Sequence, residues 1–487
     1  MKNTIAFLPR NQFHTNVFIK IGEHLNKKYG FNTTIIRELG DIDDVNVFEY
    51  EKQIEKIFHS VDISYESMEE LRKKYPDIDF MRAIYSEREF NYFPEYFGYD
   101  GVSHESQMRY LVSCFKVFEE WVESNNITAV VSELLTGLPD SILYGICKHN
   151  LIRYISVRSS KMIAGTIICD KYYDEPSRFI ETYEKFKSSG VPEDIKKKAK
   201  EHINEIIEKN EAPAYMKLTK KRFKLFTIQR IKTLFRRIGK EKIHTNSISL
   251  FQHPILNPAR YALHRFINIR KTKKSLAKWF SISIKEGEKY FIYPLHYEPE
   301  ASTLIRAFQF SDQMCVIKQI ARVLPLGVRL VVKEHKGNQG YRKSDFYKKL
   351  YYLPNVLLVP PDYNGRNLIE DSLGVITLTG RMGWEAMILD KPVIAFGETF
   401  WTSFKRVMKP ETWRDLKDCI HEIVNKDYNN ISSNDKTFSD DDDLVIYAAA
   451  YISLIHDANF VLGTDDLYSS KNVESLASML NNEILAR

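Results

Sequence analysis

A turn between a buried strand and a helix, within residues 375–397, has the residue types of a phosphate-binding site. Residues 379–383 read Thr-Gly-Arg-Met-Gly, and Glu385 follows in the first turns of the helix. A helix N-terminus attracts phosphate through its unpaired N–H groups, and glycine lets the backbone come close. A carboxylate one turn further along could accept hydrogen bonds from ribose hydroxyls. The residues of this candidate site are Thr377, Thr379, Gly380, Arg381, Gly383 and Glu385.

The same turn also fits a purely structural role. In that interpretation Thr379 is an ordinary helix N-cap, and Glu385 is a first-turn acid favoured by the helix dipole. The turn alone does not decide between packing and chemistry, so the neighbouring strand ends matter.

Two further strand ends carry ionisable side chains. Lys333 and His335 close the run "RLVVKEH", where an ammonium and an imidazole could contact phosphate. His296, Glu298 and Glu300 follow the run "KYFIYPL" directly. Closely spaced carboxylates suit general-base catalysis or nucleophilic attack on the anomeric carbon of a sugar. The alternatives are a structural histidine at 335 and a solvated acidic loop at 296–300.

The first part of the chain offers two more candidates at strand ends. Glu133 ends "ITAVVSE" and could serve as a general acid or base, or hold an acceptor hydroxyl. Arg158 ends "RYISVRS" and could bind a carboxylate or phosphate with two parallel hydrogen bonds. A first-turn acid that caps the following helix is the alternative for Glu133.

Short β-branched runs alternate with amphipathic helices over both ends of the chain, which predicts an α/β protein with two doubly wound parallel sheets. Ligands of such sheets bind beyond the carboxyl ends of the strands, where all the candidate residues lie. We expect an N-terminal Rossmann-like domain at 1–175 and a helical, strongly basic insertion at 176–285. A C-terminal Rossmann-like domain at 286–435 and C-terminal helices at 436–487 complete the expected organisation.

The charge distribution is uneven. Residues 217–280 contain 18 Lys or Arg and one acid, Glu241, although the net charge of the chain is only +6. Basic and apolar residues interleave there at mostly helical spacing, which fits a helix on an anionic membrane surface at 217–278. A solvated helix packed on its own domain is the alternative. No helix-turn-helix, zinc-finger or RNP pattern accompanies the charge, so we expect no nucleic-acid partner.

Bulk features point to a cytoplasmic protein. The five cysteines are scattered without CxxC spacing, which argues for free thiols in a reducing compartment and against a zinc site. Residues 1–25 have no signal-peptide layout, and no apolar run reaches the length of a membrane span. No Asp-x-Asp motif follows a strand convincingly, because residues 441–443 lie in a turn, so we expect no metal requirement and no cofactor.

Taken together, these stretches resemble the bacterial capsular polysaccharide synthesis proteins, including Kdo transferases, over roughly residues 290–400. The resemblance rests on Pro294-Leu295-His296 with the two glutamates, on Lys333-Glu334-His335, and on Thr379-Gly380 through Glu385-Ala386 to Lys391-Pro392-Val393. It implies a glycosyltransferase of the GT-B type, with two Rossmann-like domains facing a cleft and a nucleotide-sugar held by the C-terminal one. It also implies a CMP-linked donor, typically CMP-Kdo, with the histidine and the hydroxyl-bearing turn at its phosphate.

The sequence departs from the family pattern at three places. Lys336 stands where the family has proline, Gly380 replaces the serine of the turn, and glutamates with His296 replace the usual Asp and Gln of the first loop. A UDP-linked donor is therefore an alternative. The turn and helix are also similar to those of the wider class that includes UDP-N-acetylglucosamine 2-epimerases.

The leading interpretation is a glycosyltransferase of capsule or O-antigen assembly. His335, Lys333 and residues 379–383 hold the donor phosphate, and Glu385 holds the ribose. Glu298 or Glu300 lies by the anomeric carbon, Glu133 acts as acid/base, and the basic segment docks the enzyme at the inner membrane face, near glycan or lipid-linked acceptors. A nucleotide-sugar epimerase and a non-catalytic export partner are the other interpretations.

Overall fold

The computed structural model describes residues 3–9, 12–37, 47–133, 135–171, 174–208, 256–281, 284–338, 341–425, 443–461 and 464–486. These residues form two compact units. Unit 1 comprises the described parts of Met1–Tyr172, Lys220–Ala262 and Ile455–Arg487. Unit 2 comprises the described parts of Tyr173–Thr219 and Leu263–Leu454. Most of the basic segment, residues 217–255, lies outside the described residues.

The division differs from the expected domains at two places. The helices of residues 176–208, expected in the insertion, belong to unit 2. The expected C-terminal helices are shared, because residues 443–454 belong to unit 2 and residues 455–487 to unit 1. The reason is packing, since the apolar helix at 443–453 lies against the helices at 179–189 and 193–208.

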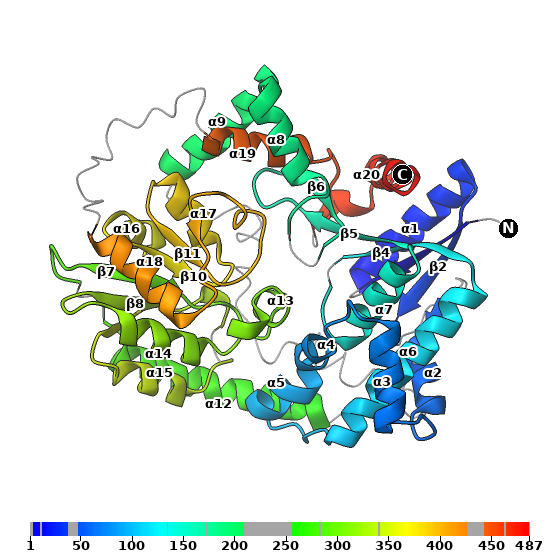
Figure 1. Ribbon diagram of the computed structural model, residues 1–487, viewed down its shortest axis with the longest axis horizontal. Coiled ribbons are helices and arrows are strands. Elements are labelled where there is room, and N and C mark those ends of the chain that lie inside the picture. Colours follow the sequence, from blue (N-terminus) through cyan, green and yellow to red (C-terminus); the bar gives the residue numbers. More distant parts are fainter. Residues whose placement is uncertain are drawn as a thin grey trace. The chain divides into compact units, whose positions relative to one another are not determined.

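Unit 1 is built on a six-stranded sheet, ordered β3-β2-β1-β4-β5-β6 (Figure 1). All neighbours are parallel except β5 and β6, which are antiparallel. The central strands are almost wholly buried, because helices cover both faces. The strands are β1 (Thr4–Leu8), β2 (Asn32–Arg37), β3 (Val47–Glu49), β4 (Ile127–Ser132), β5 (Arg153–Ser159) and β6 (Thr166–Cys169).

Two helices from opposite ends of the chain cover one face of this sheet. α1 (Gln12–Tyr29) and α20 (Ser470–Leu485) pack side by side, and their apolar side chains share one core with β1, β2, β4 and β5. α7 (Leu138–His149) packs against β5 and against α6, which in turn contacts α2. The other helices of the unit are α2 (Tyr50–Ile57), α3 (Tyr65–Lys74), α4 (Phe80–Ser86), α5 (Arg88–Phe97), α6 (His104–Ser124) and the short η6 (Asp465–Tyr468).

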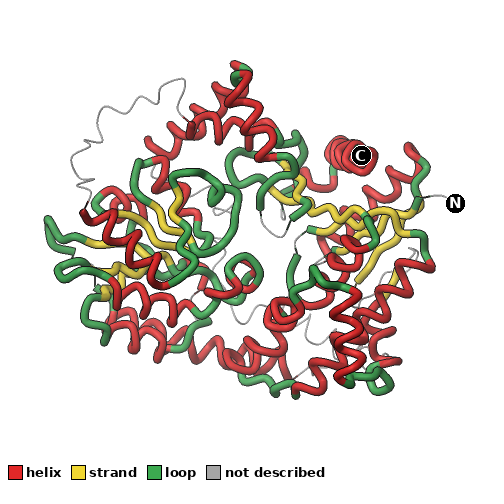
Figure 2. The backbone as a smooth tube through the Cα atoms, in the orientation of Figure 1, coloured by secondary structure: helices red, strands yellow, loops and turns green. Residues whose placement is uncertain are grey.

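Unit 2 has a six-stranded sheet of order β12-β11-β10-β7-β8-β9, and every neighbouring pair is parallel. Figure 2 shows the strands of each unit in yellow, flanked by helices in red. The strands are β7 (Tyr290–Pro294), β8 (Arg329–Lys333), β9 (Val356–Val359), β10 (Gly374–Thr377), β11 (Val393–Ala395) and β12 (Val407–Met408).

The core of unit 2 lies between one face of this sheet and the helices α14, α15 and α18. α17 packs on β10 and β11 and also contacts α9 and α16. The remaining helices are α8 (Phe179–Ser189), α9 (Glu193–Glu208), α12 (Leu256–Trp279, which begins in unit 1), α13 (Ala301–Leu304), η2 (Phe308–Phe310), α14 (Gln313–Val323), η3 (Lys336–Asn338), α15 (Ser344–Tyr351), α16 (Gly365–Glu370), α17 (Arg381–Ile388), α18 (Trp413–Asn425) and α19 (Asp443–Ser453).

The expected fold class is confirmed for both units. In each sheet the chain winds outward from a central strand to one edge, returns to the centre and winds outward to the other edge. The direction reverses between β1 and β4 in unit 1 and between β7 and β10 in unit 2. In open α/β sheets ligands bind beyond the carboxyl ends of the strands at such a reversal point. The structure therefore directs attention to the loops that follow these four strands.

Candidate functional site at the carboxyl edge of unit 2

His296 bridges the two central strands of unit 2. It lies in the loop after β7, and its Nε2 accepts a hydrogen bond from the backbone N–H of Thr379, after β10, at 3.1 Å. Burial lowers the pKa of His296 to about 3, and the charges of His335 and Arg342 act in the same direction. The imidazole is therefore neutral and carries its proton on Nδ1.

Two buried donors at this point have no hydrogen-bond partner within the described residues. They are Nδ1 of His296 and the hydroxyl of Thr379, whose residues are 7% and 8% exposed. Buried polar groups are nearly always paired, so two unpaired donors on adjoining loops mark a place where a ligand's acceptor atoms can bind.

Gly380 lets the second loop approach the imidazole. A Cβ atom at this position would lie 2.7 Å from the Thr377 hydroxyl and 3.4 Å from Nε2 of His296. The Thr377 hydroxyl accepts a hydrogen bond from the Gly380 N–H at 3.1 Å, which shapes the turn. Gly380 is also the N-cap of α17 and has no side chain that could cap it.

His335 carries its proton on the other ring nitrogen from His296. Its Nδ1 accepts the N–H of Gly337 at 3.1 Å, so the neutral ring carries its proton on Nε2. Burial lowers the pKa of His335, although Glu334 and Glu300 partly oppose this effect. The ring is half-buried after β8, where an Nε2–H group can donate to a phosphate oxygen.

The two candidate carboxylates after β7 have different environments. Glu298 is 3% exposed and accepts hydrogen bonds from Gln313 at 2.5 Å and from Arg342 at 3.1 Å. Burial raises its pKa, and Arg342 and Gln313 oppose this rise. Glu300 is exposed and accepts a hydrogen bond from the hydroxyl of Ser302 at 2.6 Å.

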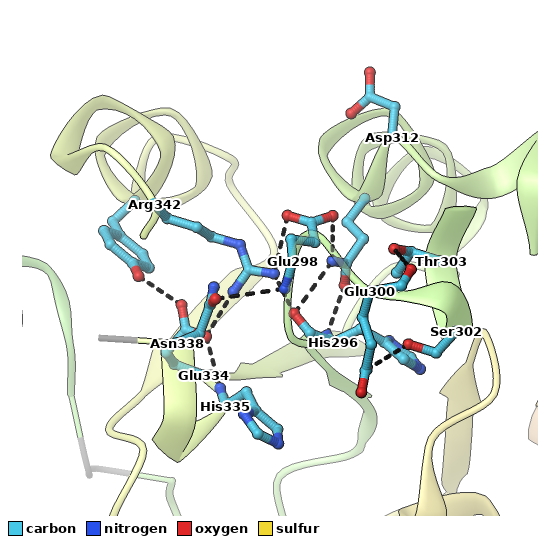
Figure 3. Close-up of polar contacts among 12 residues, drawn as sticks. His296, Glu298, Glu300, Ser302, Thr303, Asp312, Glu334, His335, Asn338 and Arg342 are labelled. Atoms are coloured by element: carbon cyan, nitrogen blue, oxygen red, sulfur yellow. Dashed lines mark hydrogen bonds and ion pairs between the residues drawn. The ribbon is translucent and has the colours of Figure 1, made fainter. Parts of the chain in front are cut away.

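Figure 3 shows this difference directly. The carboxylate of Glu300, the imidazole of His335 and the hydroxyl of Ser302 point to one side of the loops, whereas the carboxylate of Glu298 points to the opposite side. Glu300 is therefore accessible to a substrate, and Glu298 supports the loop from inside.

Arg342 ties the loops after β7 and β8 together. Its guanidinium is fully buried between Glu298 and Glu334 and also donates to the backbone carbonyl of His296. Glu334 accepts further hydrogen bonds at 2.6 Å from the hydroxyl of Tyr347 and from the N–H of His335. Arg342 thus contributes to the placement of both imidazoles.

α17 carries the remaining candidates of this unit. Arg381 pairs with Glu385 one turn later, at 3.2 Å, and both side chains are partly exposed. Burial raises the pKa of Glu385, while Arg381, Arg366 and Lys333 oppose this rise. Gly383 faces the interior, since a Cβ there would lie 2.4 Å from the ring of Trp401. Gly383 therefore has a packing role, and its expected place beside a ligand stays a prediction.

Lys333 ends β8, and its ammonium donates to the carbonyl of Pro361 at 2.8 Å. Burial lowers its pKa to about 8, with a contribution from Lys336. The carboxylate of Glu385 raises the pKa, which indicates that the two side chains are neighbours. Lys333 is therefore a cation whose charge is lost just above neutral pH.

The pKa of Lys333 predicts how the binding of a nucleotide, the ligand expected from the sequence, would depend on pH. Below about pH 8 Lys333 is protonated and attracts phosphate, and above it the charge is lost, so the dissociation constant of a bound nucleotide should rise from pH 8 to 9.5, by up to about tenfold per pH unit. Lys333→Arg keeps its charge over this range and should flatten the profile. Calorimetric titrations at several pH values measure both. An unchanged affinity of the wild-type protein up to pH 9.5 would remove Lys333 from the phosphate site.

Unit 1 has a comparable arrangement at its own reversal point. His14, in the first turn of α1, forms an ion pair through Nδ1 with Glu133, which follows β4. The His14 ring is 1% exposed and stacks on Phe460 at 4.9 Å, whereas the Glu133 side chain is 27% exposed. Glu133 is thus the accessible member of a His–Glu pair. Arg158, on β5, is only 5% exposed, and its expected contact with a carboxylate or phosphate stays a prediction.

Sequence reasoning missed Arg342, Gln313 and His14. His14 could have been found, because it follows the first strand of its unit just as His296 follows the first strand of the other. Arg342 and Gln313 lie in polar stretches without a strand-end signal, and only the folded chain brings them to Glu298.

Two general searches complete the description of the site. Over the described ranges, no group of His, Cys, Asp or Glu side chains is placed to hold a metal ion. None of the described helices combines the length and apolar character needed to cross a bilayer. The expectation that no metal or cofactor takes part stays a prediction.

Comparison with known proteins places these residues in context. Residues 184–404 match the model of a family described as capsule polysaccharide biosynthesis protein. This range contains every candidate residue of unit 2, whereas Glu133 and Arg158 lie outside it. Among curated proteins, none matches the chain.

Solved structures include several distant likenesses. KpsC from Thermosulfurimonas dismutans, a beta Kdo 2,7 transferase, has 11% identity and a TM-score of 0.29, covering 63% of this chain and 80% of that one. UDP-GlcNAc 2-epimerase from Methanocaldococcus jannaschii, in complex with UDP-GlcNAc and UDP, has 13% identity and a TM-score of 0.25, covering 88% and 94%. The Neisseria meningitidis epimerase bound to UDP-GlcNAc has 12% identity and a TM-score of 0.27, covering 100% of both chains.

At these scores the likenesses leave the substrate open. The match to the family model is of a different kind, because it covers the loops that carry His296, His335 and the turn before α17. Over residues 184–404 the chain is therefore similar to the capsule polysaccharide biosynthesis proteins, the family that its motifs resemble.

Proposed function

We propose that the chain is a glycosyltransferase of bacterial capsule or O-antigen assembly that takes its sugar from a nucleotide-activated donor, with a CMP-linked sugar such as CMP-Kdo favoured. The observation that carries the proposal is the set of groups at the reversal point of unit 2. This set consists of two neutral imidazoles, the Lys333 ammonium and the N-terminus of α17, whose N-cap is Gly380. All of them lie within the residues that match the family. These groups suit a donor phosphate.

The proposed reaction uses these groups in defined roles. The acceptor hydroxyl forms a bond to the anomeric carbon while the bond from that carbon to the donor phosphate breaks, and the nucleotide leaves with the electron pair. Lys333, the Nε2–H group of His335 and the N-terminus of α17 stabilise the charge on the departing phosphate. Glu385 accepts hydrogen bonds from the ribose. Arg381 adds positive charge nearby.

Carboxylates handle the sugar and the proton. Glu300 is the accessible carboxylate beside the side chains that contact the donor phosphate, and its assigned position is next to the anomeric carbon of the donor sugar. Glu133 is assigned as the acid/base group that exchanges the proton of the acceptor hydroxyl. Glu298, buried against Arg342, positions the loop. The acceptor is a glycan or lipid-linked glycan at the inner face of the cytoplasmic membrane.

A thermal-shift panel of CMP, CDP, UDP, GDP and CMP-Kdo tests the donor. A nucleotide at 100 times its dissociation constant stabilises the folded protein by about 2.7 kcal/mol, which raises the melting temperature by several degrees. We expect CMP and CMP-Kdo to stabilise the protein. Lys333→Met should abolish the shift, whereas Lys197→Met, at an exposed position on α9, should retain it.

The other outcomes separate the remaining interpretations. Stabilisation by UDP alone would replace the CMP-linked donor by a UDP-linked one and bring the epimerase-like enzyme forward. Stabilisation by none of the five would contradict a nucleotide-sugar site in unit 2 and favour a non-catalytic partner in polysaccharide export.

A further inference from the structure

α12 exposes a surface that is both basic and apolar. In its part within unit 2, from Leu263 onward, Leu263 and Ile267 are 58% and 39% exposed, one helical turn apart. Basic side chains at spacings of three, four or seven residues continue this stripe, because these spacings return to the same helix face. The exposed basic residues on this face are Arg270, Lys271, Lys274 and Lys278.

The opposite face of α12 is buried although it is polar. Arg265, Asn268 and Thr272 are 8%, 7% and 3% exposed. Arg265 donates to the hydroxyl of Tyr341 at 2.9 Å, and its guanidinium lies 4.3 Å from the centre of that ring. Arg265 therefore helps to fix this face of α12 to unit 2, while the side chains of Leu263 and Ile267 remain outside. This is the reverse of an ordinary surface helix.

An aromatic cluster lies at the C-terminal end of the same helix. Trp279 contacts Tyr351 and Tyr352, with ring centres 4.8 and 5.9 Å apart. The two tyrosines are 48% and 66% exposed. The ammonium of Lys278 lies 4.5 Å from the centre of the Trp279 ring. Tryptophan, tyrosine and lysine together are typical of the boundary between lipid headgroups and acyl chains.

Charge favours an anionic partner for this surface. Residues 256–279 contain no acid. On the neighbouring α15, the acid Asp345 is already paired with Lys349 at 2.7 Å. A soluble polyanion would contact the cations alone, whereas the exposed leucine, isoleucine and aromatic rings also require an apolar partner. A membrane with anionic lipids supplies both.

We propose that the outward face of α12, together with Trp279, Tyr351 and Tyr352, docks unit 2 on an anionic membrane surface. The aliphatic and aromatic side chains enter the headgroup region, and the basic side chains contact lipid phosphates. This surface lies wholly within described residues, so it acts in addition to any contribution from residues 217–255.

Vesicle co-sedimentation of the full-length chain tests the proposal without any enzymatic readout. The probes are vesicles of phosphatidylcholine alone and vesicles with about one-third phosphatidylglycerol, each at low and high salt. We expect binding to the anionic vesicles only, weakened by salt. The double variant Leu263→Ser/Ile267→Ser should lower the partition coefficient at least about tenfold, since the apolar contribution is lost.

Two further variants keep the test decisive. Lys274→Gln/Lys278→Gln should weaken binding and reduce its salt dependence, whereas Lys197→Gln/Lys198→Gln, at exposed positions on α9, should leave it unchanged. Unchanged melting temperatures exclude misfolding. The proposal is overturned if the serine variant binds vesicles as tightly as the wild-type protein does. It is also overturned if dextran sulfate, a soluble polyanion, displaces vesicles from the wild-type protein and from the serine variant equally well, because the surface would then recognise only negative charge.

Discussion

Turnover should fall about 10²–10⁴-fold when Glu300 is replaced by glutamine, with no change in melting temperature and little change in nucleotide binding. The reason is the position of the side chain, which is exposed beside His335 and accepts a hydrogen bond from the Ser302 hydroxyl. Removing its charge takes away the proposed catalytic group and leaves the phosphate site intact. Single-turnover assays with a labelled donor measure the rate, and the nucleotide thermal shift reports on binding.

Two other substitutions of glutamate by glutamine provide the comparison. Glu286→Gln, at an exposed turn before β7, should behave like the wild-type protein. Glu298→Gln should lower the melting temperature, since this carboxylate is buried against Arg342. If Glu298→Gln abolishes turnover at full stability while Glu300→Gln does not, the catalytic role belongs to Glu298 and the present assignment of the two is reversed.

Arg342→Met should destabilise unit 2 by about 3–5 kcal/mol, because it leaves Glu298 and Glu334 buried without their cation. The expected fall in melting temperature is roughly 6–20 °C. Burial already raises the pKa of Glu298 and Arg342 opposes this rise, so loss of the cation raises that pKa further, and the deficit should shrink as the pH falls and Glu298 takes up a proton. Thermal unfolding between pH 8 and pH 5 measures both effects.

A multiple variant identifies the cause. Arg342→Met combined with Glu298→Gln and Glu334→Gln removes the buried charges together and should recover much of the lost stability. Arg72→Met breaks an exposed pair with Glu69 and should hardly change the melting temperature. No recovery in the multiple variant would show that packing of the arginine side chain, and not charge balance, holds the two loops together.

The fold was largely predictable, because β-branched runs and amphipathic helices alternate clearly in the sequence. Each β-branched run that leads to a candidate site residue forms a strand of one of the two expected sheets. β6 was not foreseen as a strand, because its antiparallel pairing with β5 depends on a turn and not on hydrophobic periodicity. The placement of residues 176–208 in unit 2 was missed for a similar reason, since helix–helix packing leaves no local signal.

The candidate site was predictable in part. The rule that ligands bind beyond the carboxyl ends of parallel strands selected His296, Lys333 and His335, which the structure brings to one edge of one sheet. The same rule could not distinguish Glu298 from Glu300, two residues apart, because their difference comes from Arg342, more than forty positions later. The role of Gly383 depended in the same way on Trp401. Such roles are set by tertiary contacts and cannot be read from spacing.

Glu87 makes the two similar units unequal. In unit 1 the helix after β4 begins at Leu138, and the carboxylate of Glu87 accepts the N–H of that residue at 3.1 Å. Both helices have a glycine as N-cap, Gly137 in unit 1 and Gly380 in unit 2, but in unit 1 the carboxylate of Glu87 occupies the place where a phosphate would bind. A carboxylate of this kind disfavours a bound phosphate at the start of α7, so the proposed donor site has one location on two similar scaffolds instead of two.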